Sequence, residues 1–244
     1  MNVSLQGKVA VVTGAGKGVG AAVAKDFAER GCSLALLGPD EERLRLIKDE
    51  CTQRGVPIQK REEQMEKLLA GVEASLGSID ILVNAMVSME PGQLADTTPS
   101  MVHGAMNSNV IPIVIATKAV AKYLEKTKGC VINVSCASAK RTSPSLLAFG
   151  MSQAAVNYFT ETSALDLASR KIRVNAVSPS AGVFTDVMGI PPLKEPRSPI
   201  LPHKVPTLDD VTQAVAFLAS DESLFITGEN ICVDGGYHAS GIAF

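Results

Sequence analysis

A glycine-rich segment near the N-terminus is the first feature whose residue types and spacing could do chemistry. It reads Gly-Ala-Gly-Lys-Gly-Val-Gly from Gly14 to Gly20, after the β-branched run Lys8 to Thr13 and before a helical stripe that includes Val23 and Phe27. A strand, a glycine turn and a helix place backbone N–H groups at the positive end of a helix dipole, which suits a pyrophosphate. The same glycines also permit a tight turn and close packing when no ligand binds.

Apolar runs and helical patterns alternate along the rest of the chain. Because most expected strands are apolar on both faces, they predict a parallel sheet covered by helices on both sides, in a single α/β domain over residues 1–244. The strands are expected at residues 8–13, 33–37, 79–83, 130–135, 172–177 and 231–234, and the helices at 41–54, 62–76, 100–125, 152–169 and 208–219. Pro112 lies inside one expected helix and predicts a kink there.

Several segments, in the same order as the motifs of one family, resemble the short-chain dehydrogenases/reductases. Beside the glycine turn with its Gly14, Gly18 and Gly20 spacing, they are residues 80–85 (Asp-Ile-Leu-Val-Asn-Ala), 107–109 (Asn-Ser-Asn), 131–135 (Val-Ile-Asn-Val-Ser), 173–179 (Arg-Val-Asn-Ala-Val-Ser-Pro) and 226–236. The resemblance implies a three-layer, doubly wound Rossmann fold with a mostly parallel central sheet. It also implies NAD or NADP as cofactor, held by residues of these motifs: Gly14, Lys17, Gly18, Val19, Gly20, Asn84, Ala85 and Thr185.

The chain departs from this family at the residues that do its chemistry. Family members transfer a hydride while a tyrosine exchanges the proton, a lysine four residues later lowers the tyrosine pKa, and a serine binds the substrate oxygen. Here those positions hold Phe149, Gln153 and Cys136, and only Asn109 of the catalytic tetrad remains. Phenylalanine has no proton to give, and neutral glutamine does not shift a pKa as an ammonium does. We therefore assign no catalytic residue from the sequence.

Neighbouring hydroxyl groups do not replace the missing ones. Ser135 is adjacent to Cys136, but successive side chains of a strand point to opposite faces. Tyr158 lies nine residues beyond Phe149, which places it on the opposite face of a helix, and Ser152 points about 100° away from Gln153.

The expected cofactor contacts are eroded as well. Family members choose NAD with an acidic residue after the second strand, or NADP with a basic one nearby. Here that strand ends in Leu37-Gly38-Pro39-Asp40, and Asp40 is interpreted as the N-cap of the next helix. Lys17 still offers charge to a 2′-phosphate. The third strand is expected to be nearly missing around residues 55–59, and Met86 and Val87 bring bulk toward the cofactor.

Composition excludes several classes of function. The chain has 244 residues, 46% of them hydrophobic, and a net charge of -2, so it has no basic excess for nucleic acid or an anionic membrane. The apolar run at residues 110–116 is too short to span a bilayer, and no signal peptide is visible. We expect a cytoplasmic protein. The five cysteines are interpreted as buried thiols, and the three histidines lack metal-ligand spacing, so no metal is predicted.

The resemblance also implies assembly through the two long helices, at residues 100–125 and 152–169. A homodimer, a homotetramer, or a hetero-oligomer with an active paralogue would follow. The proline-rich stretch at residues 190–206 is expected to cover the cleft and to select a small-molecule ligand.

Three functional hypotheses remain open from the sequence. The first is a protein that has lost hydride-transfer chemistry: a pseudoenzyme, a ligand-binding protein or a silent subunit. The second is a non-redox enzyme, such as a cyclase, isomerase or lyase, that reuses the cleft and Cys136. The third is a weak NADP(H)-dependent reductase in which water supplies the proton.

Overall fold

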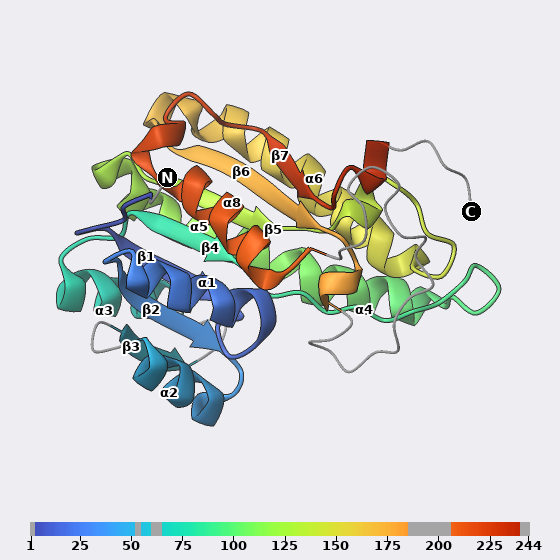
Figure 1. Cartoon of the computed structure of the whole chain (residues 1–244), viewed down its shortest axis with the longest axis horizontal. Coiled ribbons are helices and arrows are strands. Elements are labelled where there is room, and N and C mark those ends of the chain that lie inside the picture. The colour runs from blue at the N-terminus through green and yellow to red at the C-terminus, as the bar shows by residue number, and fades with distance from the viewer. Residues whose placement is uncertain (1–2, 52–54, 60–64, 185–205, 240–244) are drawn as a thin grey trace.

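Seven strands form one sheet in the order β3-β2-β1-β4-β5-β6-β7, and every pair of neighbours is parallel (Figure 1). The structure is a computed structural model that describes residues 3–51, 55–59, 65–184 and 206–239. The strands are β1 Val9–Thr13, β2 Ser33–Gly38, β3 Gly55–Gln59, β4 Ile81–Asn84, β5 Cys130–Val134, β6 Arg173–Pro179 and β7 Asn230–Val233.

Two helical layers cover the sheet, because the strands are apolar on both faces. The helices are α1 Gly18–Glu29, α2 Glu41–Glu50, α3 Met65–Leu76, α4 Pro99–Asn109, α5 Ile111–Thr127, α6 Leu147–Leu167 and α8 Leu208–Ala219. Helices α2, α1 and α8 contact one another in series, as do α3, α5 and α6 on the opposite face (Figure 1). Along β1, Ala10 and Val12 pack into the core with α1 and α8, whereas Val9 and Val11 pack into the core with α3 and α5. The predicted three-layer, doubly wound fold is confirmed, and the described sheet is parallel throughout.

The prediction of a nearly missing third strand is wrong. Strand β3 pairs with β2 over its whole length, from Leu34 opposite Gly55 to Gly38 opposite Gln59. Five residues are an ordinary strand length.

Two helices differ from the sequence prediction at positions that matter for the site. The helix expected at residues 100–125 is divided into α4 and α5 at Val110, because Pro112 has no N–H to continue the hydrogen-bond ladder. Helix α6 begins at Leu147, five residues earlier than expected, so Phe149 lies in its first turn. Burial of Phe149 in the core outweighs the low helix propensity of Gly150 next to it. Within the described residues, no helix is long and apolar enough to cross a membrane.

Candidate functional site

A pocket of about 360 Å³ opens where β1 lies between β2 and β4. The strand order reverses there, because the chain runs from β1 outward to β2 and β3 and then returns to β4 on the other side of β1. Open parallel sheets bind ligands at such a switch point. The lining residues come from the glycine turn, the start of α2, the segment after β4 and the segment after β6: Gly14, Gly16, Lys17, Gly18, Val19, Pro39, Asp40, Arg43, Ala85, Met86, Val87, Ser88 and Phe184.

The N-terminus of α1 faces this pocket without a side-chain cap. Lys17 precedes the helix in an extended conformation, its side chain makes no capping hydrogen bond, and the first turn contains no acidic residue. The N–H groups of that turn and the positive end of the helix dipole are therefore left for an anion. The residues present fit the diphosphate of a dinucleotide.

The glycines of the turn divide into packing residues and a pocket residue. A Cβ on Gly20 would lie 2.3 Å from the Gly14 carbonyl oxygen, and a Cβ on Gly14 would lie 2.7 Å from the Ala85 oxygen. These two glycines are required for the turn to pack on α1 and β4, whether or not a ligand binds. A Cβ on Gly16 would meet its nearest atom, Cβ of Arg43, at 3.5 Å, an ordinary contact, so Gly16 leaves space in the pocket wall.

Two cations, Lys17 and Arg43, and one carboxylate, Asp40, line the pocket. Asp40 accepts a hydrogen bond from the Arg43 backbone N–H at 3.0 Å, which confirms its interpretation as an N-cap. Its carboxylate also pairs with Nε of Arg43 at 3.2 Å, and both side chains remain about half exposed. Arg43 is a pocket residue that sequence reasoning missed. The only signal for it was its place three residues after the N-cap, on the turn that faces the strand ends.

The four residues that the resemblance places at the family's tetrad positions are buried. Cys136, Phe149, Gln153 and Asn109 are each no more than 1% exposed, and none is among the residues that line the pocket. Cys136 and Phe149 belong to the same buried apolar cluster as residues of α1 and α8. The side-chain oxygen of Gln153 is buried and has no hydrogen-bond partner. The phenylalanine and glutamine therefore present no ionisable group to a ligand.

Asn109 instead fastens the pocket wall to α6. Its Oδ1 accepts from the Ser88 N–H at 2.7 Å, and its Nδ2 donates to the Ser88 carbonyl at 2.9 Å. The same Nδ2 donates to Oγ of Ser152 at 2.9 Å, and Ser152 donates to the Phe149 carbonyl at 2.7 Å. The segment after β4 is thus held in place by one buried amide. This link to Ser152 was not visible from sequence spacing.

The remaining candidate residues do not line the pocket or lie outside the described part of the chain. Asn84 is buried and donates to Oδ1 of Asn133 at 2.9 Å, so it points into a polar network under the helices and does not line the pocket; Gly20 does not line it either. Oγ of Ser135 donates to the Gln153 carbonyl at 3.4 Å, and Tyr158 is 73% exposed. Thr185 and residues 190–205 lie outside the described part of the chain.

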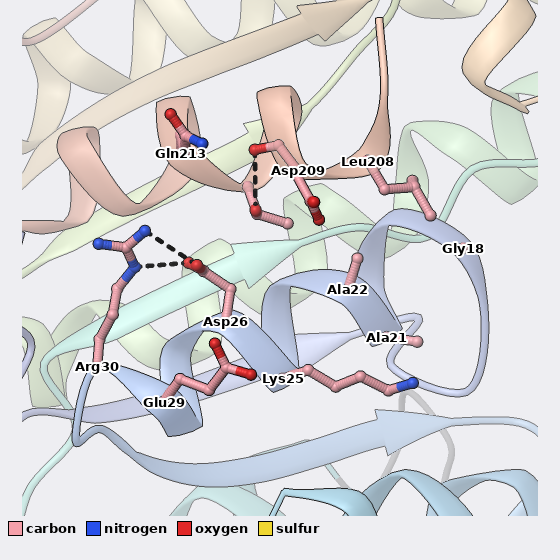
Figure 2. A pocket seen from close by; sticks show the side chains of 11 residues that line it. Gly18, Ala21, Ala22, Lys25, Asp26, Glu29, Arg30, Leu208, Asp209 and Gln213 are labelled. Atoms are coloured by element: carbon pink, nitrogen blue, oxygen red, sulfur yellow. Dashed lines mark hydrogen bonds and ion pairs between the residues drawn. The ribbon is translucent and has the colours of Figure 1, made fainter. Parts of the chain in front are cut away.

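A second and larger hollow, of about 610 Å³, lies between α1 and α8 (Figure 2). Three of its charged side chains, Lys25, Asp26 and Arg30, are engaged in ion pairs. Both Nε and Nη2 of Arg30 donate to Asp26, at 2.7 and 2.9 Å, and Lys25 pairs with Glu50 of α2. Those pairs stabilise α1 and its contact with α2. None of the tetrad positions borders this hollow.

Comparison with known proteins agrees with the fold. A family model described as Enoyl-(Acyl carrier protein) reductase matches residues 14–238. The chain is 31% identical to carbonyl reductase [NADPH] 2 of Sus scrofa, over 98% of this chain and 100% of that one. It is 29% identical to 2,3-dihydro-2,3-dihydroxybenzoate dehydrogenase of Bacillus subtilis, over 95% and 96%. A 3-ketoacyl-(acyl-carrier-protein) reductase from Brucella melitensis, solved with NADH, superposes with a TM-score of 0.88 at 27% identity, over 96% and 100%.

The protein thus has the doubly wound α/β fold of dinucleotide-binding proteins. It belongs to the short-chain dehydrogenase/reductase family of NAD(P)-dependent oxidoreductases.

Proposed function

We propose that this chain binds a nicotinamide dinucleotide at the glycine turn but has lost the standard proton transfer of its family. One contrast carries the proposal. The uncapped N-terminus of α1 still opens on a pocket, whereas the tyrosine and lysine positions hold the buried, non-ionisable Phe149 and Gln153. The chain would then act as a ligand-binding protein or as a silent subunit.

The missing groups matter because hydride transfer to a carbonyl leaves an oxygen that needs a proton. A bound dinucleotide supplies the hydride, and a positioned acid accelerates the proton transfer by about 10²–10⁴-fold. Phe149 offers no proton, and Gln153 carries no charge to lower the pKa of a neighbour. Oxidoreductase turnover by this chain should therefore be slower, by at least that factor, than turnover by a family member that has the tyrosine and the lysine.

The alternatives receive less support. A non-redox reaction at Cys136 would need the thiol to reach a substrate, yet this residue is fully buried and does not line the pocket. A weak reductase would need water to reach the carbonyl oxygen in a pocket that none of the tetrad side chains lines. Both remain outcomes of the experiment below.

Cofactor choice should favour NADP(H) over NAD(H). Lys17 and Arg43 place two cations around the outer pocket, and these would attract a 2′-phosphate. Asp40 opposes this, but its carboxylate is already engaged with Arg43 and the N-terminus of α2.

Titration with NADPH and NADH, followed by nicotinamide fluorescence, tests the binding. We expect saturable NADPH binding that weakens about tenfold in Arg43→Ala, with little change for NADH. Arg45→Ala is a matched control, because Arg45 lies on the same helix, pairs with Glu41 and does not line the pocket. If neither NADPH nor NADH binds, the proposal that the chain binds a nicotinamide dinucleotide is wrong.

Turnover is measured separately, with NADPH and a panel of carbonyl compounds. The native chain should show no cofactor oxidation above background. The triple variant Cys136→Ser, Phe149→Tyr, Gln153→Lys is the companion test, with Phe149→Tyr alone as its control. Clear turnover by the native chain would contradict the loss of chemistry.

A further inference from the structure

The carboxyl end of β7 brings together three side chains that the dinucleotide pocket does not use. Cys232 lies on β7, Asp234 follows it, and His238 belongs to the short helix η5, Tyr237–Ala239. Their potential ligand atoms all lie within 4.8 Å of one another. Across the described ranges this is the one such group of three. It differs from an acidic surface cluster because it combines a thiol, a carboxylate and an imidazole.

The carboxylate at the centre of this group is fixed in position. Asp234 is 3% exposed, and its Oδ1 accepts from the Gly236 N–H at 3.0 Å. Its Oδ2 accepts from the His238 N–H at 2.8 Å and lies 2.9 Å from Nδ1 of the His238 ring. The backbone turn therefore orients both Asp234 and the imidazole before any ion arrives. Cys232 and His238 are only partly buried, so an ion has a path from solvent.

The donor set selects the metal. Thiolate and imidazole together favour zinc over magnesium or calcium, which prefer oxygen ligands alone. Three protein ligands with a fourth position for water is a common arrangement of zinc. We propose that Cys232, Asp234 and His238 bind one zinc ion per chain. In a tetrahedral site the ligand atoms are about 3.5 Å apart, so Oδ2 of Asp234 and Nδ1 of His238, which are 2.9 Å apart, would separate and give up their contact when zinc binds.

One cation competes with the ion. Lys140 lies close enough to the Cys232 thiol to lower its pKa, against the larger effect of burial, which raises that pKa. The Lys140 ammonium also donates to the Asn230 carbonyl at 3.2 Å. Because Lys140 is exposed, it can turn into solvent when zinc replaces the thiol proton.

The neighbouring Arg141 supports the site without occupying it. Its Nη1 donates to the Tyr237 carbonyl at 2.6 Å, and its guanidinium lies 4.3 Å from the centre of the Tyr237 ring. This anchors η5 beside β7. A zinc ion would add a second tie between the last strand of the sheet and η5.

Zinc titration of metal-free protein by calorimetry tests this proposal. The native chain should bind one equivalent, and Cys232→Ser and His238→Ala should each weaken binding at least tenfold, since even outer-sphere changes at metal sites cost 10–100-fold. His103→Ala and Cys51→Ser are the matched controls, because the first is exposed on α4 and the second lies at the end of α2. Both should bind zinc like the native chain.

Cobalt substitution and a second variant separate a metal site from a structural role. Co²⁺ should give a thiolate charge-transfer band in the near ultraviolet that is absent in Cys232→Ser. Because Cys232→Ser and His238→Ala test different ligands, one of them remains informative if the other does not fold. Lack of saturable zinc binding by the native chain, or unchanged affinity in Cys232→Ser and His238→Ala, would overturn the proposal. The dinucleotide titration is independent of this outcome.

Discussion

Phe149 is the residue on which the chemical interpretation depends most. It is 1% exposed and belongs to the main apolar core, so its side chain contributes to the stability of the fold. Gln153, one turn later, leaves a buried oxygen without a hydrogen-bond partner. A buried oxygen without a hydrogen-bond partner lowers the free energy of unfolding. A lysine at this position would have no such oxygen.

The burial of Phe149 predicts the cost of restoring a hydroxyl group there. Phe149→Tyr should lower the free energy of unfolding by about 1–3 kcal/mol, because it places a polar group in an apolar core. Phe149→Leu changes the shape of the side chain without adding a polar atom, and it serves as the comparison. Urea denaturation of both variants measures the difference. Unchanged stability in Phe149→Tyr would mean that the hydroxyl finds a partner in the site.

Asn109 predicts a link between stability and ligand binding. Asn109→Ala should lower the free energy of unfolding by about 1–3 kcal/mol, because the Ser88 backbone and the Ser152 hydroxyl lose their partner. NADPH binding should weaken in parallel, since Ser88 lines the pocket. Asn107→Ala, at an exposed position of the same helix, should change neither denaturation nor the fluorescence titration.

At the scale of the element, the junction of β1 and α1 combines a packing requirement with a binding site. Gly14 has a φ of +67°, and neither it nor Gly20 has room for a Cβ, whereas Gly16 does. A glycine pattern in the sequence therefore mixes two physical causes.

Two cysteines at the strands of the sheet have thiols with raised pKa values. Burial raises the pKa of Cys32, just before β2, to about 12 and that of Cys130, on β5, to about 11.

The two causes can be separated by alanine substitution in the glycine turn. Gly20→Ala should reduce the free energy of unfolding by about 1–3 kcal/mol or more, because the backbone must move away from the new Cβ. Gly16→Ala should leave stability nearly unchanged and reduce NADPH affinity, since it fills part of the pocket. Thermal denaturation and the fluorescence titration together measure this pair. Equal losses of stability would refute the division.

The buried thiols predict an alkaline loss of stability. An unfolded thiol has a pKa of about 8.5, below both folded values, so the unfolded chain releases these protons first as the pH rises. Stability from the two thiols is complete below about pH 8.5 and falls up to pH values near 11 and 12, by about 1.4 kcal/mol per pH unit for each thiol. Urea denaturation between pH 8 and 10.5 should show a steeper decline in the native chain than in Cys32→Ala, Cys130→Ala. Equal slopes would contradict it.

At the scale of the whole molecule, α5 and α6 present apolar side chains to solvent. The large exposed ones on these helices are Ile111, Val114, Met151, Tyr158 and Leu165. Together with family resemblance, this surface supports our proposal that the chain assembles into a homodimer, a homotetramer or a hetero-oligomer with an active paralogue. An active partner would give a chain without its own proton donor a role as a silent subunit.

The assembly proposal predicts the effect of one charge on that surface. Leu165 is 80% exposed, so Leu165→Lys should leave the monomer folded while placing a charge in the interface. Light scattering after size-exclusion chromatography should show a dimer or tetramer for the native chain and a smaller species for the variant. Phe225→Lys, exposed outside these two helices, tests whether any exposed apolar residue has the same effect. A monomeric native chain would refute the proposal.

The sequence by itself determined the order of strands and helices and the family, because hydrophobic periodicity and the glycine turn are local patterns. It also predicted that Asp40 caps a helix, which the structure confirms. The assignment of Phe149, Gln153 and Cys136 to the family's tyrosine, lysine and serine positions stays a prediction. Only the tertiary structure decided that Phe149, Gln153 and Cys136 are buried away from the pocket, that Arg43 lines it, and that Asn109 holds Ser88 to α6. These facts depend on contacts between segments far apart in the chain. The group of Cys232, Asp234 and His238 lies within seven residues, but a turn fixed by Asp234 was needed to bring the three side chains together.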